Sequence, residues 1–239
     1  MKMRRNNEDP GSTWRSKLCR GRSVLFESLE ARRFLAVDLV TREITLPYPR
    51  SDVAATAVDG LVLFAGCDTL NSQGVSYSSE VDIYNTATGT WSTSQLSAAR
   101  SGIAATTIGD LAIFAGGQNA GGDTSTVDVY DAQTGAWTTW QMPKAYTGLA
   151  ATSAGTKVFL AGGGSPSAGS IGGDSEDIPI YDTSAGDWVT AALSTPRDQL
   201  AATTVDDLVM FAGGGHLYNV TDSAAMSDSV DIYDTTTDQ

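Results

Sequence analysis

Three arginines and a tyrosine occupy the same place in four parts of the chain, and their side chains could bind an anion or a sugar. Arg100, Tyr146 and Arg197 each follow a tryptophan by nine residues, and Arg50 has the corresponding place at the start of the series. A guanidinium group presents a planar fork of donors that suits carboxylates and hydroxyl-bearing ligands. The spacing therefore predicts that these four side chains lie at one end of a repetitive domain. They would form either a ligand site or bonds between neighbouring loops.

The other candidates for chemistry are less specific. His216 is the only histidine of the chain, and a histidine metal site needs further ligands. Asp174, Glu176 and Asp177 could hold Ca²⁺, but they lack the regular spacing of oxygen ligands found in calcium loops. The glycine runs end strands and open no helix, so no phosphate-binding loop is expected. We therefore predict no catalytic residue, no bound metal and no cofactor.

The elements that position these residues come from a fourfold internal repeat. An apolar run ending in Ala-Gly recurs at intervals of 50, 46 and 51 residues, and each copy follows an Ala-Ala-Thr segment. A period in this range is typical of propellers and solenoids, because a single unit cannot bury its apolar faces alone. The four copies of the run are 63–66, 113–116, 159–162 and 210–213.

Each copy is interpreted as four short strands. In the first copy an Ala-rich strand at 53–58 precedes Asp59-Gly60, a dipeptide that favours a two-residue hairpin. The apolar run 61–65 does not alternate with polar residues, which predicts a strand buried on both faces between two neighbouring sheets. A third strand ends at Tyr84 and a fourth begins at Trp91. The equivalent turns are 109–110, 155–156 and 206–207.

These columns resemble the kelch repeat over residues 41–239. The matching features are paired glycines after the second strand, Tyr-Asp pairs, a Thr-Gly-x-Trp turn, and the Met142-Pro143 and Pro196-Arg197 junctions. The resemblance implies an all-β propeller of about four four-stranded blades, in which the glycine, tyrosine and tryptophan columns are structural. These positions are Gly66, Gly116, Gly117, Gly162, Gly163, Gly213, Gly214, Tyr84, Tyr130, Tyr181, Tyr233, Trp91, Trp137 and Trp188.

The repeat offsets also predict the domain limits and a way of closing the ring. An N-terminal segment spans 1–40, and a propeller spans 41–239, with repeats at about 50–97, 98–143, 144–194 and 195–239. Arg42–Leu46 matches a fourth strand and the last copy lacks one, so residues 41–49 are expected to pair beside Val230–Tyr233 and remove an exposed edge. Three interpretations remain open: a closed four-bladed ring, part of a larger propeller, or a partial ring completed by self-association.

The charge is divided sharply along the chain. Residues 1–35 carry a net charge of +5 and residues 36–239 carry −18. The acidic body would repel phosphate backbones, so nucleic-acid binding is not expected, whereas it would suit cationic partners. No run of 18 apolar residues is present, so no membrane-spanning helix is predicted. The two cysteines, Cys19 and Cys67, could pair in an oxidising space, but Cys67 also stands where later copies have glycine.

A short segment near the N-terminus predicts the location of the protein. Residues 26–36 resemble the LEPR-XLL motif, which occurs at the N-terminus of many large bacterial surface or exported proteins. Leu29-Glu30, Arg32-Arg33 and Leu35 match the motif, whereas Ala31 and Phe34 depart from it. The resemblance implies an extracellular or cell-envelope protein. The alternative is a chance amphipathic helix in a cytoplasmic protein.

Four long polar connections between second and third strands provide the expected binding surface. They are rich in Gly, Ser, Asp and Asn, and binding residues concentrate on such loops when a rigid scaffold holds them. We therefore predict a non-catalytic, exported module that recognises a protein or glycan through its long-loop face. The alternatives are a carbohydrate-directed enzyme related to kelch-propeller oxidases or epimerases, and a non-functional remnant of a longer gene. The four connections are 68–80, 118–126, 165–177 and 216–229.

Overall fold

The first hairpin shows how the local sequence forms a blade. Strand β1 (Ala54–Val58) and strand β2 (Leu61–Asn71) are joined by Asp59 and Gly60, whose φ angles are 46° and 74°. Two successive residues with positive φ form a turn whose twist matches that of the paired strands, and Asp and Gly adopt this conformation at low cost. The three equivalent turns predicted from the sequence also join adjacent paired strands.

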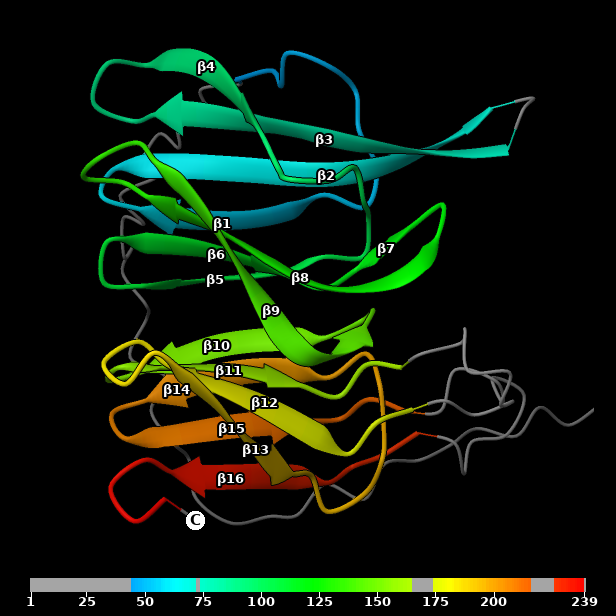
Figure 1. Ribbon diagram of the computed structural model, residues 1–239, viewed down its shortest axis with the longest axis vertical. Helices are drawn as coiled ribbons and strands as arrows, with labels where there is room; N and C mark the ends of the chain where they lie inside the picture. The colour runs from blue at the N-terminus through cyan, green and yellow to red at the C-terminus, as the bar shows by residue number, and fades with distance from the viewer. Residues whose placement is uncertain (1–43, 72–73, 165–173, 216–225, 239) are drawn as a thin grey trace, which may run out of the picture. The chain divides into compact units, whose positions relative to one another are not determined.

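The computed structural model describes residues 44–71, 74–164, 174–215 and 226–238. All regular structure in these segments is β, arranged as four antiparallel sheets that we term blades 1 to 4 (Figure 1). Residues 45–239 form one compact unit. The LEPR-XLL-like segment 26–36, Cys19 and the other residues before Ile44 lie outside the described part of the chain.

The predicted four-strand blade is present three times. Blade 1 adds β3 (Gly74–Asn85) and β4 (Thr90–Gln95) to the first hairpin, in the order β1-β2-β3-β4. Blade 2 repeats this order as β5-β6-β8-β9, and blade 3 as β10-β11-β12-β13. The strands of blade 2 are β5 (Ala104–Ile108), β6 (Leu111–Ala115), β8 (Gly122–Asp131) and β9 (Trp137–Tyr146). Those of blade 3 are β10 (Ala150–Ala154), β11 (Lys157–Ala161), β12 (Asp177–Asp182) and β13 (Asp187–Ala192).

Blade 4 differs from the others because it has three strands. It contains β14 (Ala201–Val205), β15 (Leu208–Ala212) and β16 (Val230–Asp234), and β16 pairs with β15 alone among the described strands. Residues 44–46, which were expected to supply its outer strand, belong to no strand. The rest of that predicted strand, Arg42 and Glu43, lies outside the described residues. The closing pair is therefore not formed by the described part of residues 41–49.

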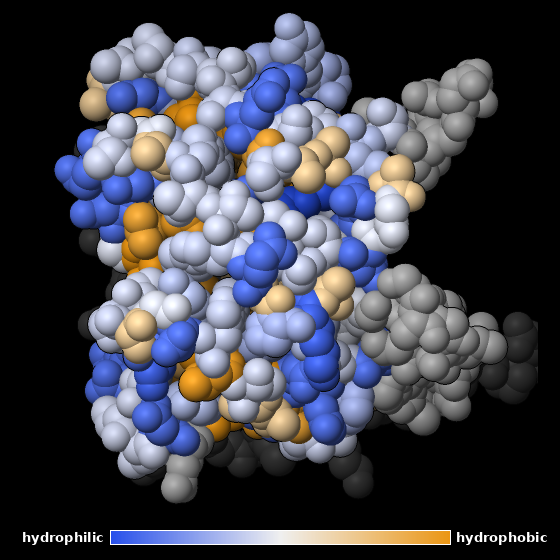
Figure 2. Space-filling model, in the orientation of Figure 1, coloured by the Kyte–Doolittle hydropathy of each residue, from blue (hydrophilic) through white to orange (hydrophobic). Residues whose placement is uncertain are grey.

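The core lies between blades. Residues that alternate along each strand point to opposite faces of a sheet. One face of blade 1, with Leu63 and Val81, packs on the opposite face of blade 2, with Phe114. Blades 2 and 3 and blades 3 and 4 pack in the same way, so each inner blade is buried on both sides, as the unalternating apolar runs predict. On the face shown in Figure 2, apolar residues lie in the seams between blades, and hydrophilic residues are scattered over the surface around them.

The Ala-Ala-Thr segments form the innermost strands, which touch from blade to blade. Strand β5 contacts β1 and β10, and β10 also contacts β14. Threonine hydroxyls join them: Thr56 Oγ1 lies 2.6 Å from Thr107 Oγ1, and Thr152 Oγ1 lies 2.9 Å from Thr204 Oγ1. Small side chains permit this close approach while hydroxyls provide cross-links, which explains why alanine and threonine recur in this strand.

The glycine pairs mark the places where three backbone segments meet. A Cβ on Gly116 would lie 2.6 Å from the carbonyl oxygen of Tyr146 in the next junction, and a Cβ on Gly117 would lie 2.3 Å from that of Ser101 in its own junction. Both have positive φ, 64° and 92°. A side chain would clash at either position, so these glycines have the structural role that the repeat predicts. Cys67 replaces the second glycine of blade 1 and is a buried free thiol.

The tyrosine and tryptophan columns pack together, and Trp91, Trp137 and Trp188 are all partly buried. Trp137 lies 5.1 Å from Tyr130 between ring centroids, and the equivalent pairs of blades 1 and 3 are separated by 5.0 Å. The tryptophan is the first or second residue of the outermost strand. Trp137 uses this position to donate a hydrogen bond from Nε1 to Ser94 Oγ of blade 1, at 2.8 Å.

Two of the four predicted long loops are extensions of the blades. In blade 1, β2 and β3 continue as a hairpin to Asn71 and Gly74 after a β-bulge between Ala65 and Cys67. In blade 2, β7 (Gln118–Asn119) pairs with the start of β8. Glycine and serine in these segments suggested irregular loops, but antiparallel pairing continues through them. Residues 165–173 and 216–225 of the other two connections lie outside the described segments.

Candidate functional site

The connections at the two ends of the strands differ, and we term these two sides of the blades the turn edge and the hairpin edge. At the turn edge, first and second strands join through two-residue turns, and third and fourth strands through short turns. At the opposite edge, the hairpin edge, second and third strands join through extended connections such as β7–β8, and each blade passes to the next through a junction (Figure 1). The junctions are residues 96–103, 147–149 and 193–200. Of the four predicted site residues, Arg100 and Arg197 lie in junctions, Tyr146 ends β9 directly before one, and Arg50 precedes the first blade.

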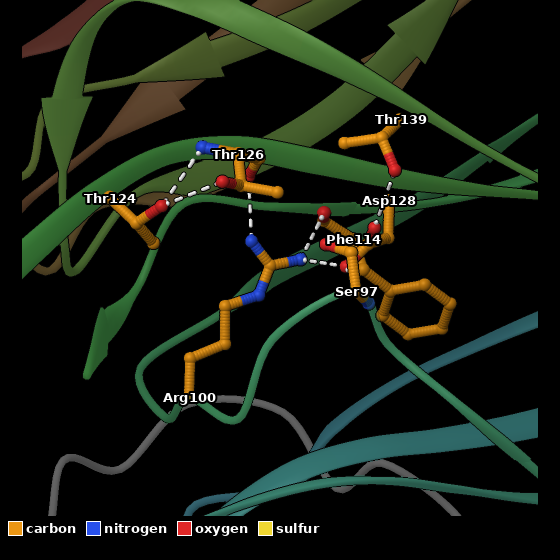
Figure 3. A network of polar contacts seen from close by, with 7 residues as sticks. All are labelled: Ser97, Arg100, Phe114, Thr124, Thr126, Asp128 and Thr139. Atoms are coloured by element: carbon orange, nitrogen blue, oxygen red, sulfur yellow. Dashed lines mark hydrogen bonds and ion pairs between the residues drawn. The ribbon is translucent and has the colours of Figure 1, made fainter. Parts of the chain in front are cut away.

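Arg100 reaches from its junction into blade 2 and ties two of its strands together. Its Nη1 donates to the carbonyl oxygen of Thr126 at 2.8 Å, and its Nη2 donates to that of Phe114 at 3.1 Å. Nη2 also forms an ion pair with Asp128 Oδ2 at 2.7 Å (Figure 3). The same carboxylate accepts hydrogen bonds from Ser97 N and Thr139 Oγ1. Arg100 and Asp128 thus connect β6, β8, β9 and the junction.

Arg197 repeats this arrangement in blade 4. Its Nη1 donates to the carbonyl oxygens of Gly213 and Ser229, both at 2.9 Å, and its Nη2 pairs with Asp231. Asp231 in turn accepts a hydrogen bond from Ser194 N, as Asp128 does from Ser97 N. The ion pair, the bond to the carbonyl oxygen two residues before the aspartate and the bond from the junction backbone therefore recur, whereas the second carbonyl partner differs: Phe114 in blade 2 and Gly213 in blade 4.

Arg50 makes the corresponding contacts in blade 1. Its Nη1 donates to the carbonyl oxygen of Glu80 at 2.8 Å, and its Nη2 lies 2.8 Å from Glu80 Oε1 and 2.9 Å from Asp82 Oδ2. Asp82 is fully buried. Burial raises the pKa of Asp82, and the positive charge of Arg50 opposes that rise. The arginine therefore provides a positive charge that favours the ionised form of a buried carboxylate.

Blade 3 has a different pair at the same two repeat positions. Tyr146 replaces the arginine, and Pro179 stands where the other blades have aspartate. The Tyr146 hydroxyl donates to Asp177 Oδ2 at 2.7 Å, and Lys144 Nζ contacts the same oxygen at 2.7 Å. The hydrogen bond from Lys144 is the main cause of a lowered pKa at Asp177, and burial is the main cause of a raised pKa at Tyr146. Blade 3 therefore lacks both the arginine and the aspartate of the other blades, which is expected if the two residues act as a pair.

The contacts favour the structural interpretation of these four residues. Arg100 and Arg197 are 0% and 1% exposed, Tyr146 is 4% exposed, and the Arg50 side chain is 3% exposed. Their polar groups face the backbone and carboxylates of their own blades. Binding of an anionic or sugar ligand by them remains a prediction that these contacts do not support.

Sequence reasoning missed the carboxylates that complete the pairs. Asp82, Asp128 and Asp231 occupy one repeat position, two residues before the repeated tyrosine of blades 1, 2 and 4. The pairing joins residues 28 to 34 positions apart, so local spacing does not reveal it. The available signal was the joint replacement in blade 3, where Tyr146 and Pro179 replace both partners.

The acidic candidates of the connection into β12 are only partly grouped. Asp177 is engaged by Tyr146 and Lys144, whereas Glu176 is exposed. The residues that the structure describes include no group of three or more His, Cys, Asp or Glu side chains placed to hold a metal ion. His216 lies outside the described segments. In those segments no helix is long and apolar enough to span a membrane.

The described exposed residues of the hairpin edge are of mixed character, and acidic side chains occur among them beside the apolar Met226. Ala120 and Gly121 are exposed at the tip of the β7–β8 hairpin, and Glu176 and Asp228 are exposed beside β12 and β16. Lys144 is also exposed, but its charge is paired with Asp177. Among the described residues, this edge therefore presents exposed carboxylates, whereas the arginines are buried.

The turn edge contains a hollow of about 380 Å³ between blades 2 and 3. It is lined by turn residues that include Asp110, Asp131, Gln133 and Thr156. The Asp131 carboxylate bonds within its own turn, because Oδ1 accepts hydrogen bonds from the backbone N–H groups of Gln133 and Thr134. Those bonds, chiefly the one from Thr134, lower the pKa of Asp131. The hollow is therefore a gap between well-ordered turns.

Comparison with known proteins agrees with the architecture. The kelch motif matches residues 99–139, which run from the residue before Arg100 to Thr139 in β9. The matched segment thus contains the Arg100–Asp128 pair, the Gly116-Gly117 pair, and Tyr130 with Trp137. No curated protein matches the chain. The motif match and the four sheets together support kelch-type blades of a β-propeller, a repeat that generally mediates protein interactions.

Proposed function

We propose that this chain is a non-catalytic, exported module that binds a partner protein through the hairpin edge. The observation that carries the proposal is the difference between the two edges. Tight turns restrict the turn edge, whereas the hairpin edge projects paired extensions from a scaffold clamped by the arginines. Binding residues concentrate on such projections when a rigid framework holds them. A glycan is the second class of ligand that exposed polar hairpins can bind.

The charge of the hairpin edge favours a basic partner. Glu176 and Asp228 are exposed there, and residues 36–239 carry a net charge of −18. An acidic surface attracts a positive one and accelerates encounter, and salt screens both effects. The proposed partner is therefore a protein with a basic face, and its affinity should fall as ionic strength rises.

Export is supported by the sequence of the N-terminal segment alone. Residues 26–36 resemble a motif of bacterial surface and exported proteins, and the basic segment 1–35 differs in charge from the body. Cell fractionation of the full chain, compared with a variant in which Leu29 and Leu35 are replaced by Asp, tests this part. Equal release of both proteins into the envelope or medium would contradict it.

Site-specific photo-crosslinking tests the binding edge. A photoreactive residue at Ala120 would lie on the hairpin edge of blade 2, and the same residue at Ala136 would lie on the turn edge of that blade. Both alanines are exposed, so the pair is matched for blade and accessibility. We expect a crosslinked partner from position 120 and none from position 136. Equal crosslinking at both positions, or crosslinking only at 136, would contradict the proposal.

A further inference from the structure

The outer face of blade 4 has the composition of a buried interface but is exposed. We term it the C-terminal end face, and it consists of Val205, Met210, Ala212, Val230 and Ile232. Val205, Val230 and Ile232 are 50%, 54% and 56% exposed. In β-strands, directly paired residues share a face, and the observed register places all five together.

The same repeat positions are buried in the other three blades. The counterparts of Ile232 are Ile83, Val129 and Ile180, which are 6%, 2% and 1% exposed. Each of them contacts the blade that follows in the chain. The C-terminal end face therefore resembles one half of a blade-to-blade interface, and no following blade among the described residues covers it.

The space around Gly213, at the rim of this face, also indicates that a following blade is missing there among the described residues. A Cβ on Gly116 or Gly162 would lie 2.6 Å from a carbonyl oxygen of the next junction, at Tyr146 or Arg197. At the equivalent Gly213, the nearest atom would be Ser227 O at 3.9 Å. The space for a following junction is thus present beside blade 4 but is unfilled by the described residues.

The complementary half-interface lies on blade 1. We term it the N-terminal end face, and it includes Ala55, Val62 and Phe64. The counterparts of Phe64 in blades 2 to 4 are fully buried, whereas Phe64 is only partly buried. Ala55 is exposed, whereas its three counterparts pack on the core of the preceding blade. These counterparts are Ala105, Ala151 and Ala202.

We propose that the two end faces bind each other between two copies of this chain. At each of the three internal interfaces, the face that carries the counterpart of Ile232 packs on the face of the next blade that carries the counterpart of Phe64. Blade 1 of a second copy therefore presents the kind of face on which blade 4 can pack. Burial of exposed apolar side chains would drive the contact. An interface between two different faces is heterologous, and it produces a closed ring or an open chain of copies.

The test is the mass of the full chain in solution, measured by sedimentation velocity over a wide concentration range. We expect association to at least twice the monomer mass of 24.9 kDa. Ile232→Asp and Ala55→Asp should each abolish it, because a buried unpaired carboxylate is costly. Val189→Asp is the control, since Val189 is 55% exposed on β13 of blade 3, outside both end faces. Circular dichroism should show all three variants folded.

A mixing experiment tests the pairing of unlike faces. The Ile232→Asp chain keeps an intact N-terminal end face, and the Ala55→Asp chain keeps an intact C-terminal one. Each alone should be monomeric, and an equimolar mixture should form a dimer. Wild-type protein that is monomeric at every concentration, association that survives both end-face substitutions, or a mixture that stays monomeric would each overturn the proposal.

Discussion

The junctions into blades 2 and 3 perform the same structural task with different chemistry. Arg100 enters blade 2 as a buried cation paired with Asp128, whereas Tyr146 enters blade 3 as a neutral side chain that bonds Asp177. In blade 3 the aspartate position is Pro179, so the charge and its partner are absent together. The comparison indicates that the position of Arg100 and Tyr146 serves to hold each junction against its blade. An anion-binding site would require the positive charge, and blade 3 has a neutral tyrosine at this position.

The largest expected effect comes from removing the carboxylate of the charged pair. Asp128→Ala leaves the Arg100 charge buried and uncompensated, which should lower the free energy of unfolding by about 3–5 kcal/mol. The matched control is Pro179→Ala at the equivalent position of blade 3, where no charge depends on the residue; it should cost under about 1 kcal/mol. Urea denaturation measures both. Similar losses in the two variants would break the comparison.

The second prediction concerns the backbone contact that both junctions share. Gly66 lies close to the carbonyl oxygen of Arg100, and Gly116 lies close to that of Tyr146. An alanine at either position should therefore clash with the backbone, whether the neighbouring residue is arginine or tyrosine. The left-handed conformation alone costs an alanine roughly 1–2 kcal/mol. Gly213→Ala provides the control for that cost, because its φ is 67° but its Cβ would have open space.

We expect both junction variants to unfold at lower denaturant concentration than the Gly213 variant. Equal stability of the three would show that the close approach of the junction carbonyls is not important. A larger loss at Gly66 than at Gly116 would instead show that the arginine junction is packed more tightly than the tyrosine junction.

The third prediction concerns the neutral junction. Tyr146→Phe removes the hydrogen bond to Asp177 but leaves Lys144 paired with that carboxylate. A single hydrogen bond contributes about 0.5–1.5 kcal/mol, so the loss should be of that order and much smaller than for Asp128→Ala. The same denaturation assay checks it. A loss comparable to that of Asp128→Ala would mean that blade 3 depends on its junction as strongly as blade 2.

The smallest effect is a pH dependence common to both blades. Hydrogen bonds from Ser184 lower the pKa of Asp182 in blade 3 to about 2, and those from Thr134 and Gln133 lower the pKa of Asp131 in blade 2. A carboxyl group with a lowered folded-state pKa contributes stability at neutral pH and loses it as the pH falls below about 4 toward the folded-state value. Asp182→Asn should reduce the acid sensitivity of unfolding between these values.

Asn85 shows that an amide can perform the same role in this turn. Its Oδ1 accepts hydrogen bonds from the backbone N–H groups of Ala87 and Thr88, both at 3.0 Å, with no titrating group. Asp182→Asn should therefore keep the neutral-pH stability close to that of the wild type. An unchanged acid profile in this variant would contradict the assignment of the acid-labile stability to these turns.

Much of the fold could be predicted from the sequence because the signals are local. The Asp59-Gly60 turn, the unalternating run at 61–65 and the glycine pairs each follow from the conformation or burial of a few neighbouring residues. The extension of β2 and β3 could not be predicted in this way. It depends on a bulge after Ala65 and on pairing across a polar hairpin whose composition resembles a loop.

The candidate site could be placed from the sequence, but its role could not. The nine-residue offset from tryptophan located Arg100 and Arg197 correctly at the junctions. Their role depends on contacts with Asp128 and Asp231, which only the pairing of strands brings near.

A double-mutant cycle on Arg100 and Asp128 tests the central claim most directly, namely that the junction arginine serves its own blade. Arg100→Met and Asp128→Leu should each lower the free energy of unfolding by roughly 3–5 kcal/mol, because each leaves a buried charged group without its partner. The double variant should recover much of that loss, since apolar side chains can replace a buried ion pair at little cost. Additive losses, or an Arg100→Met chain as stable as the wild type, would contradict the account.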